Sequence, residues 1–141
     1  MAYLANETVL VFMLRVILGF LFFFQGYDKV FNVKVSGVTD FFRNESREKN
    51  WPNFLLSSSA YYTSYVEFIC GGMLILGLFK TGALYLLGID LILVCGAFSM
   101  LNPVWDMKVV YPRLILLAVL LYLPQEWDLL SLDHLIGFFI K

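Results

Sequence analysis

The stretch "VFMLRVILGFLFFFQ", residues 11–25, decides the fold of this chain because it is a nearly unbroken apolar run. Together with its flanks it extends from about residue 9 to residue 27, and a helix needs roughly 20 apolar residues to cross a hydrocarbon core of about 30 Å. Arg15 and Gln25 are the polar residues inside this run. The sequence therefore predicts a membrane-spanning helix that carries buried polar groups.

The composition of the whole chain supports an integral membrane protein. Of its 141 residues, 60% are hydrophobic and 15% are charged, whereas a soluble domain is about half apolar and a quarter charged. The lipid bilayer is therefore an expected partner, around a single domain that covers residues 1–141. A nucleic-acid partner is excluded, because ten basic and eleven acidic residues give a net charge of −1 and the aromatic residues lie in apolar segments.

Three further apolar segments predict helices at about residues 61–79, 82–101 and 109–123. The segments at 61–79 and 82–101 are separated by "KTG", residues 80–82, which allows only a tight reversal. Backbone polar groups in lipid must be satisfied within their own segment, so helices are expected. The predicted fold class is all-α, an integral membrane four-helix bundle.

Two segments outside these helices carry a weaker pattern. In the polar stretch between the first two helices, apolar residues recur at helical spacing at Val35, Val38, Phe41 and Phe42. This segment is predicted to be either a short amphipathic helix on the membrane surface or an ordinary solvated loop. The C-terminal "SLDHLIGFFIK" is too short to span, so we expect it at the interface or packed against the bundle.

The distribution of basic residues predicts the orientation in the membrane. Loops one and three contain most of them, and by the positive-inside rule both termini then lie outside the cytoplasm. We expect a multi-pass protein of a cell membrane, the bacterial inner membrane. The basic residues of these two loops are Lys29, Lys34, Arg43, Arg47, Lys49, Lys108 and Arg113.

Arg15, Glu67 and Asp90 are the charged residues inside the predicted spans, where a charge is unfavourable by several kcal/mol. At about 1.5 Å per residue, Arg15 lies roughly 10 Å deep and Asp90 roughly 12 Å deep from the same side. Their similar depth predicts an ion pair between them. Glu67 enters from the opposite face and is expected near Gln25 and Lys29.

One face of the first helix carries both polar and small residues. Arg15, Gly19, Phe22, Gly26 and Lys29 recur at intervals of four, three, four and three, so they share a face. The glycines on this face would let a neighbouring helix approach closely.

These buried polar residues have three interpretations. They fix the order and rotation of the helices, or form a proton path or a polar pocket for a quinone or another amphiphile, or reach water at the interface by snorkelling. No catalytic residues, no metal and no firm cofactor are predicted, because His134 is the only histidine and no metal-ligand cluster is visible. The candidate ligand-binding residues are Arg15, Gln25, Lys29, Glu67 and Asp90.

Three sequence elements resemble a known family. "LRVILGFLFFFQGYDKVFN" is similar to the opening of DoxX-type membrane proteins, "YVEFICGGMLILGLFKTGAL" to their second signature, and "LLSLDHLI" to a Ser-x-Asp element near their C-terminus. Many members have His where Gln25 stands, and apolar or small residues where Asp90 stands. The positions that match the family pattern are Arg15, Gly19, Gln25, Gly26, Lys29, Glu67, Gly71, Gly72, Ser131 and Asp133.

The resemblance implies a small four-helix membrane protein. The family takes its name from a subunit associated with a quinone-reducing thiosulfate oxidoreductase, and relatives are linked to redox stress complexes or to assembly of other membrane proteins. We therefore expect a non-catalytic accessory or assembly subunit, with a larger membrane protein or further copies of this chain as partner. The alternatives are a quinone-linked component of an oxidoreductase and a small proton-coupled transporter that uses Glu67 and Asp90.

Overall fold

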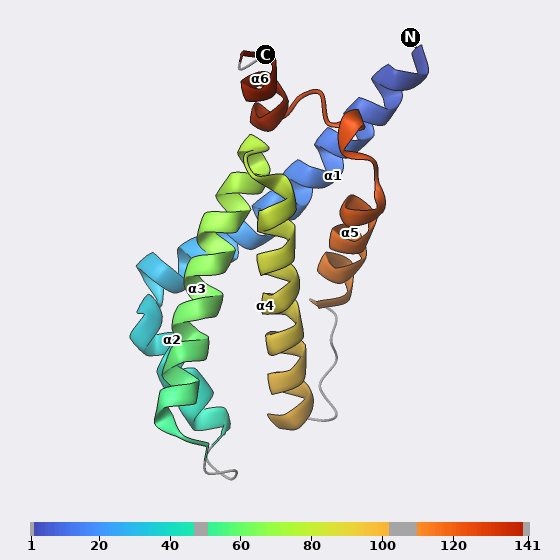
Figure 1. Cartoon of the computed structure of the whole chain (residues 1–141). Coiled ribbons are helices and arrows are strands. Elements are labelled where there is room, and N and C mark those ends of the chain that lie inside the picture. The colour runs from blue at the N-terminus through green and yellow to red at the C-terminus, as the bar shows by residue number, and fades with distance from the viewer. Residues whose placement is uncertain (1, 47–50, 102–109, 140–141) are drawn as a thin grey trace.

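The computed structural model describes residues 2–46, 51–101 and 110–139, and this part of the chain is helical with no strand. Figure 1 shows the start of α1 and the short α6 at the same end of the molecule. The elements are α1 (Ala2–Tyr27), η1 (Asp28–Asn32), α2 (Lys34–Glu45), α3 (Asn53–Leu76), α4 (Lys80–Leu101), α5 (Val110–Tyr122), η3 (Gln125–Trp127) and α6 (Leu132–Phe139).

The first helix is longer than predicted. α1 begins at Ala2 rather than near residue 9. The π-helical turn η1 follows α1 directly and ends at Asn32. Among the described residues, Ala5–Asn32 and Lys80–Ala97 are long and apolar enough to cross a membrane. α5 is apolar but has 13 residues, which is about 20 Å of helix. The apolar helices thus support a membrane protein.

α3 and α4 form the predicted helical hairpin with corrected boundaries. α3 begins at Asn53, directly after Pro52, and not near residue 61. Its first two turns are rich in serine, so hydropathy alone does not detect them. The helix ends where Gly77 takes a left-handed conformation with φ of 70°, which glycine adopts without steric penalty. α4 then begins at Lys80, so the tight reversal is confirmed.

The segment after η1 is a helix, so the solvated-loop interpretation is wrong. Val35 and Val38 of α2 are buried and pack with Ala60 of α3, while Phe41 is half exposed on another face. α5 runs from Val110 to Tyr122, close to the predicted 109–123, of which residue 109 lies outside the described residues.

The glycine-bearing face of α1 packs closely against α3, as predicted. A Cβ atom on Gly19 would lie 2.8 Å from the Ile75 side chain, and one on Gly26 would collide with the backbone of Phe68. Arg15 and Phe22 on the same face are fully buried. Glycine at these positions thus allows the backbones of α1 and α3 to approach each other closely.

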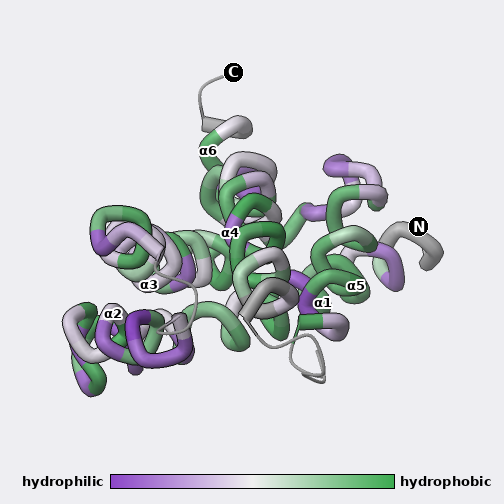
Figure 2. Tube along the Cα trace, turned by 90° about the horizontal axis from the view of Figure 1, so that it is seen from below, coloured by the Kyte–Doolittle hydropathy of each residue, from purple (hydrophilic) through white to green (hydrophobic). Residues whose placement is uncertain are grey.

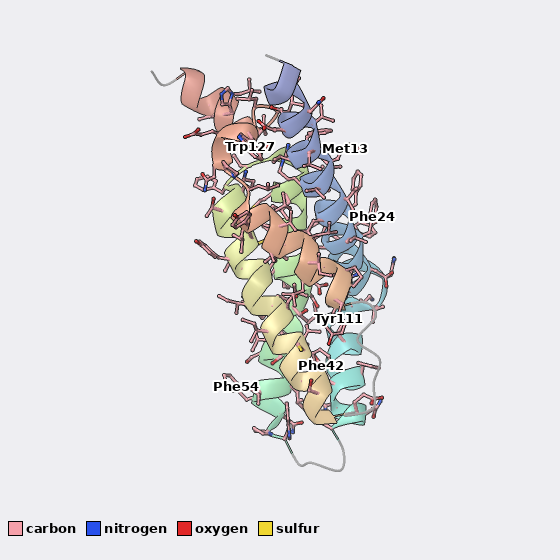
Figure 3. The ribbon with its side chains drawn as sticks, turned by 90° about the vertical axis from the view of Figure 1, so that its right-hand side faces the viewer. Met13, Phe24, Phe42, Phe54, Tyr111 and Trp127 are labelled. Atoms are coloured by element: carbon pink, nitrogen blue, oxygen red, sulfur yellow. The ribbon has the colours of Figure 1, made fainter. Side chains whose placement is uncertain are left out.

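The long helices contact one another in sequence around the molecule. α1 packs against α3, α3 against α4, α4 against α5 and α5 against α1, with α2 beside α3 (Figure 2). Many outer side chains are large and apolar, and Figure 3 shows Met13, Phe24 and Phe54 among them. The C-terminal segment packs against the α3–α4 reversal, because the Asp133 N–H donates to the Gly77 carbonyl at 3.0 Å.

Candidate functional site

Buried polar side chains gather at two levels of the helix assembly. The Arg15 cluster, near the α3–α4 reversal, comprises Arg15, Lys80 and Asp128. The Glu67 cluster, nearer the middle of α3, comprises Lys29, Thr63, Glu67 and Asp90.

Arg15 is held by the end of α3 and by the segment that follows α5. Its guanidinium donates to the carbonyls of Leu74 at 2.5 Å, Ile75 at 2.9 Å and Leu130 at 3.0 Å. Leu74 and Ile75 lie in the last turn of α3, whose carbonyls have no partner within the helix. A positive charge there also interacts favourably with the helix dipole.

Asp128 provides the negative charge for this cluster. Its Oδ2 lies 3.0 Å from Lys80 Nζ and 3.4 Å from Arg15 Nε, and all three side chains are buried. The predicted ion pair between Arg15 and Asp90 is therefore wrong. The segment after α5 folds back over the reversal and places Asp128 beside Arg15, which a count of helix depths cannot anticipate.

The Ser-x-Asp element caps two helices in this region. Asp133 accepts hydrogen bonds from the backbone N–H of Phe79 at 2.9 Å and of Lys80 at 3.1 Å, at the start of α4. Ser131 accepts one from the His134 N–H at 3.2 Å and so caps α6, as serine commonly does before a helix. Both residues thus organise the reversal rather than a ligand site.

The Glu67 cluster contains the predicted pair of Glu67 and Lys29. Lys29 reaches back from η1, and its Nζ lies 2.7 Å from Glu67 Oε2 and donates to Thr63 Oγ1 at 3.1 Å. The Thr63 hydroxyl in turn donates to Glu67 Oε1 at 3.3 Å. In the described part of the chain, no hydrogen bond links Gln25 to this group.

Asp90 extends the Glu67 cluster from α4. Its side chain is 1% exposed, and it interacts electrostatically with Glu67 and Lys29. Within the described residues, neither of its carboxylate oxygens has a hydrogen-bond partner of good geometry. A buried polar group without a partner is unfavourable by about 1–3 kcal/mol, so this carboxylate is equipped to receive a donor from a ligand.

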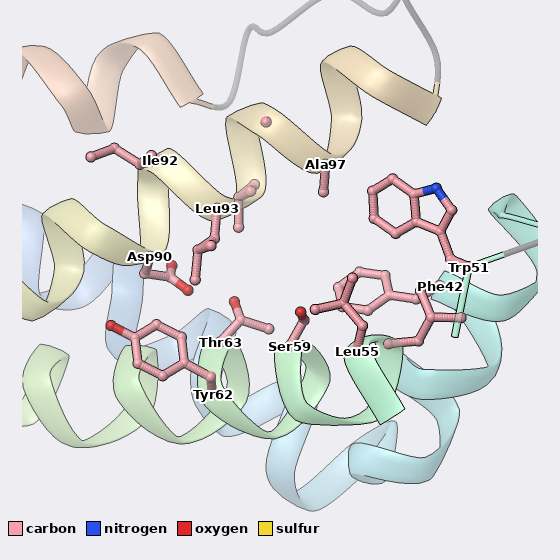
Figure 4. A pocket seen from close by; sticks show the side chains of 13 residues that line it. Phe42, Trp51, Leu55, Ser59, Tyr62, Thr63, Asp90, Ile92, Leu93 and Ala97 are labelled. Carbon is pink, nitrogen blue, oxygen red and sulfur yellow. The ribbon is translucent and has the colours of Figure 1, made fainter. Parts of the chain in front are cut away.

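A pocket of about 260 Å³ lies between α2, α3 and α4 and ends at Asp90 (Figure 4). Its walls are mainly apolar, whereas Tyr62 and Thr63 of α3 join Asp90 at its inner end. An apolar pocket with a few converging polar groups is the usual form of a small-molecule site. This pocket is the candidate functional site.

Of the predicted site residues, the structure brings Lys29, Glu67 and Asp90 together, while Arg15 belongs to the other cluster. Sequence reasoning missed Thr63 and Tyr62, although Thr63 lies four residues before Glu67 and thus on the same face of one helix. It also missed Asp128, which lies outside every predicted span and carried no signal of burial.

A family model described as DoxX matches residues 10–99 of the chain. This range includes most of α1, all of α2 and α3, and all but the last two residues of α4. No curated protein matches the chain significantly, and neither does any solved structure.

Proposed function

The chain belongs to the DoxX family, and we propose that it is a non-catalytic accessory or assembly subunit of a larger membrane complex. In this proposal α1, α3, α4 and α5 cross the bacterial inner membrane as a four-helix bundle. Loops one and three then face the cytoplasm and both termini lie outside it, in accordance with the positive-inside rule.

The observation that carries the proposal is an apolar stripe on the outer face of α1. Its members recur every three or four residues, so they share one helix face, and they are 45% to 61% exposed. Phe20 and Phe24 contact each other there, with ring centroids 5.8 Å apart. The stripe, hereafter the α1 stripe, consists of Val9, Met13, Ile17, Phe20 and Phe24.

Such a face suits a partner helix because its large side chains offer ridges for packing. Arg15, the charged residue within the apolar part of α1, points instead into the molecule, where it lies against Asp128. A partner can therefore dock on the α1 stripe without meeting a buried charge.

The proposal is tested by site-specific crosslinking in cells. A photoreactive amino acid replaces Met13 on the α1 stripe, and in a matched control it replaces Ile92, which is 71% exposed on α4. We expect one protein to crosslink at Met13 but not at Ile92, and to co-purify in mild detergent. A monodisperse species of 16.2 kDa with no partner would contradict the proposal, and crosslinks between copies would indicate a homo-oligomer.

The pocket favours a second candidate function, a quinone-linked component of an oxidoreductase. Its apolar walls end at the unpartnered carboxylate of Asp90, close to the Glu67–Lys29 pair. We expect protein purified in mild detergent to retain a quinone, and Glu67→Gln to slow electron transfer in membranes. Absence of quinone together with unchanged electron transfer would overturn this candidate.

A further inference from the structure

The pocket between α2, α3 and α4 is an apolar groove that is open on one side. Leu55 of α3 and Ile92 and Leu93 of α4 line it and are also exposed, so the groove opens between these two helices. The α4 wall belongs to Lys80–Ala97, which is long and apolar enough to cross a membrane. In a bilayer, the opening therefore faces the hydrocarbon chains of the lipids.

Polar groups are sparse along this groove (Figure 4). Tyr62 and Thr63, which lie beside Asp90 at the inner end, both donate their hydroxyls to other groups of the protein. Along the rest of the groove, Ser59 and Trp51 contribute one hydroxyl and one indole N–H. A buried water needs two to four polar partners, so most of the groove suits an apolar occupant better than water.

The volume of the groove distinguishes between the apolar occupants that a membrane offers. The groove holds about 260 Å³, whereas one turn of an α-helix, roughly 10 Å across and 5.4 Å long, fills about 420 Å³. A partner helix is therefore too wide to enter, but a single hydrocarbon chain fits. Figure 4 shows two small side chains, Ser59 of α3 and Ala97 of α4, on opposite walls of this space.

We propose that this groove binds one acyl chain of a phospholipid from the surrounding bilayer, while the headgroup stays outside the groove. The chain enters between α3 and α4 beside the exposed Ile92 and contacts Leu56, which lines the groove but is only 5% exposed. Because Phe42 of α2 also lines the groove, the bound chain joins α2 to the α3–α4 hairpin. This inference goes beyond both candidate functions and depends on neither.

The test is photolabelling by a phospholipid whose reactive group lies on the acyl chain. Full-length protein in phosphatidylcholine nanodiscs is irradiated with phosphatidylcholine that carries a diazirine in one acyl chain, and labelled residues are identified by mass spectrometry. We expect label on Leu56 and on the exposed Ile69, but none on Leu84, which is 1% exposed and does not line the groove. Label on Ile69 without label on Leu56 would overturn the proposal.

Substitutions on the two walls test whether the label enters through the groove. Ala97→Phe fills the groove from α4, so labelling of Leu56 should fall to the background level of Leu84. Ala118→Phe makes the same change on an exposed position of α5 and should leave the labelling of Leu56 unchanged. Ser59→Leu fills the groove from α3 and should have the same effect as Ala97→Phe, so the test does not depend on the folding of one variant.

The source of the chain is tested with two further probes that carry the same diazirine chain. Phosphatidylglycerol should label Leu56 as strongly as phosphatidylcholine does, because the groove contacts the chain and not the headgroup. Label that depends on the headgroup would contradict recognition of the chain, and label from the free fatty acid alone would overturn the assignment to a phospholipid. Labelling of Leu56 that persists in both filled variants would contradict entry between α3 and α4.

Discussion

The Arg15 cluster and the Glu67 cluster are both buried, yet they differ in what lies beside them. Arg15 donates to three carbonyls and lies against Asp128, which also pairs with Lys80, so this cluster joins the end of α3 to the segment after α5. Asp90 interacts electrostatically with Glu67 and Lys29 and lies at the inner end of the pocket (Figure 4). A cluster that joins segments stabilises the fold, whereas polar side chains that line a pocket are candidates for contact with a ligand.

The same difference separates the polar residues that the sequence singled out. Arg15, Ser131 and Asp133 gather at the α3–α4 reversal and cap or join its ends. Lys29 and Glu67 lie at the pocket level instead. Stability measurements can tell the two groups apart.

The largest effect is expected for Arg15→Ala. The substitution removes one of the two cations beside Asp128 and the guanidinium donor of the Leu74, Ile75 and Leu130 carbonyls, and removing one partner of a buried ion pair destabilises by about 3–5 kcal/mol. Unfolding in detergent or lipid, followed by circular dichroism, measures the loss. Arg43→Ala is the matched control, because the exposed Arg43–Asp40 pair contributes about 1 kcal/mol or less. Equal losses of stability in Arg15→Ala and Arg43→Ala would contradict the stabilising role of the Arg15 cluster.

A smaller effect is expected for Gly26→Ala, which acts at the level of the Glu67 cluster. The new Cβ would collide with the backbone of Phe68 and lie 2.8 Å from the carbonyl carbon of Glu67, so α1 must move away from α3. Overpacking of this kind destabilises by about 1–3 kcal/mol. Gly82→Ala meets nothing within 4 Å and should be neutral or stabilise by up to about 1 kcal/mol. The same unfolding assay measures both variants. A loss of stability in Gly26→Ala but not in Gly82→Ala would confirm that the contact between α1 and α3 requires glycine at residue 26.

Asp133→Ala should have an effect of about 1 kcal/mol, because it removes the two hydrogen bonds that cap the start of α4. Asp133→Asn keeps one acceptor oxygen and should recover part of the loss. Hydrogen exchange of the Phe79 and Lys80 amides reports the cap directly. Unchanged exchange in Asp133→Ala would contradict the assignment of the Asp133 side chain as the cap of α4.

Much of the fold was predictable because it depends on local patterns. Apolar length located α1, α4 and α5, and the interval of three and four residues identified the buried face that Arg15 and Phe22 share. The start of α3 was missed because a run of three serines follows its first apolar residues. α2 was left undecided because a few apolar residues at helical spacing in a short polar stretch fit both a surface helix and a loop. Local hydropathy does not determine either feature.

The pairing of charges was harder to predict because it depends on register between helices. Counting outward from the reversal at residues 77–79, Glu67 and Asp90 lie eleven and twelve residues from residue 78, and are therefore level in an antiparallel hairpin. Depths counted separately from the predicted end of each helix did not reveal that these two residues are level. Asp128 could not have been found by either count, because tertiary folding of the segment after α5 brings it to Arg15.

The smallest effect on stability is expected for Asp90→Asn. This variant tests most directly how the Glu67 cluster differs from the Arg15 cluster. The carboxylate has no hydrogen bond of good geometry within the described residues to lose, and Lys29 keeps its pair with Glu67. The amide has nearly the same size as the carboxyl group, and the lost attraction to Lys29 is offset by the lost repulsion from Glu67, so the free energy of unfolding should change by less than about 1 kcal/mol. The unfolding assay used for Arg15→Ala measures it, in ligand-free protein. A loss as large as that of Arg15→Ala would mean that Asp90 holds the helices together as Arg15 does. A small loss, by contrast, would mean that the burial of Asp90 is maintained for what enters the pocket beside it.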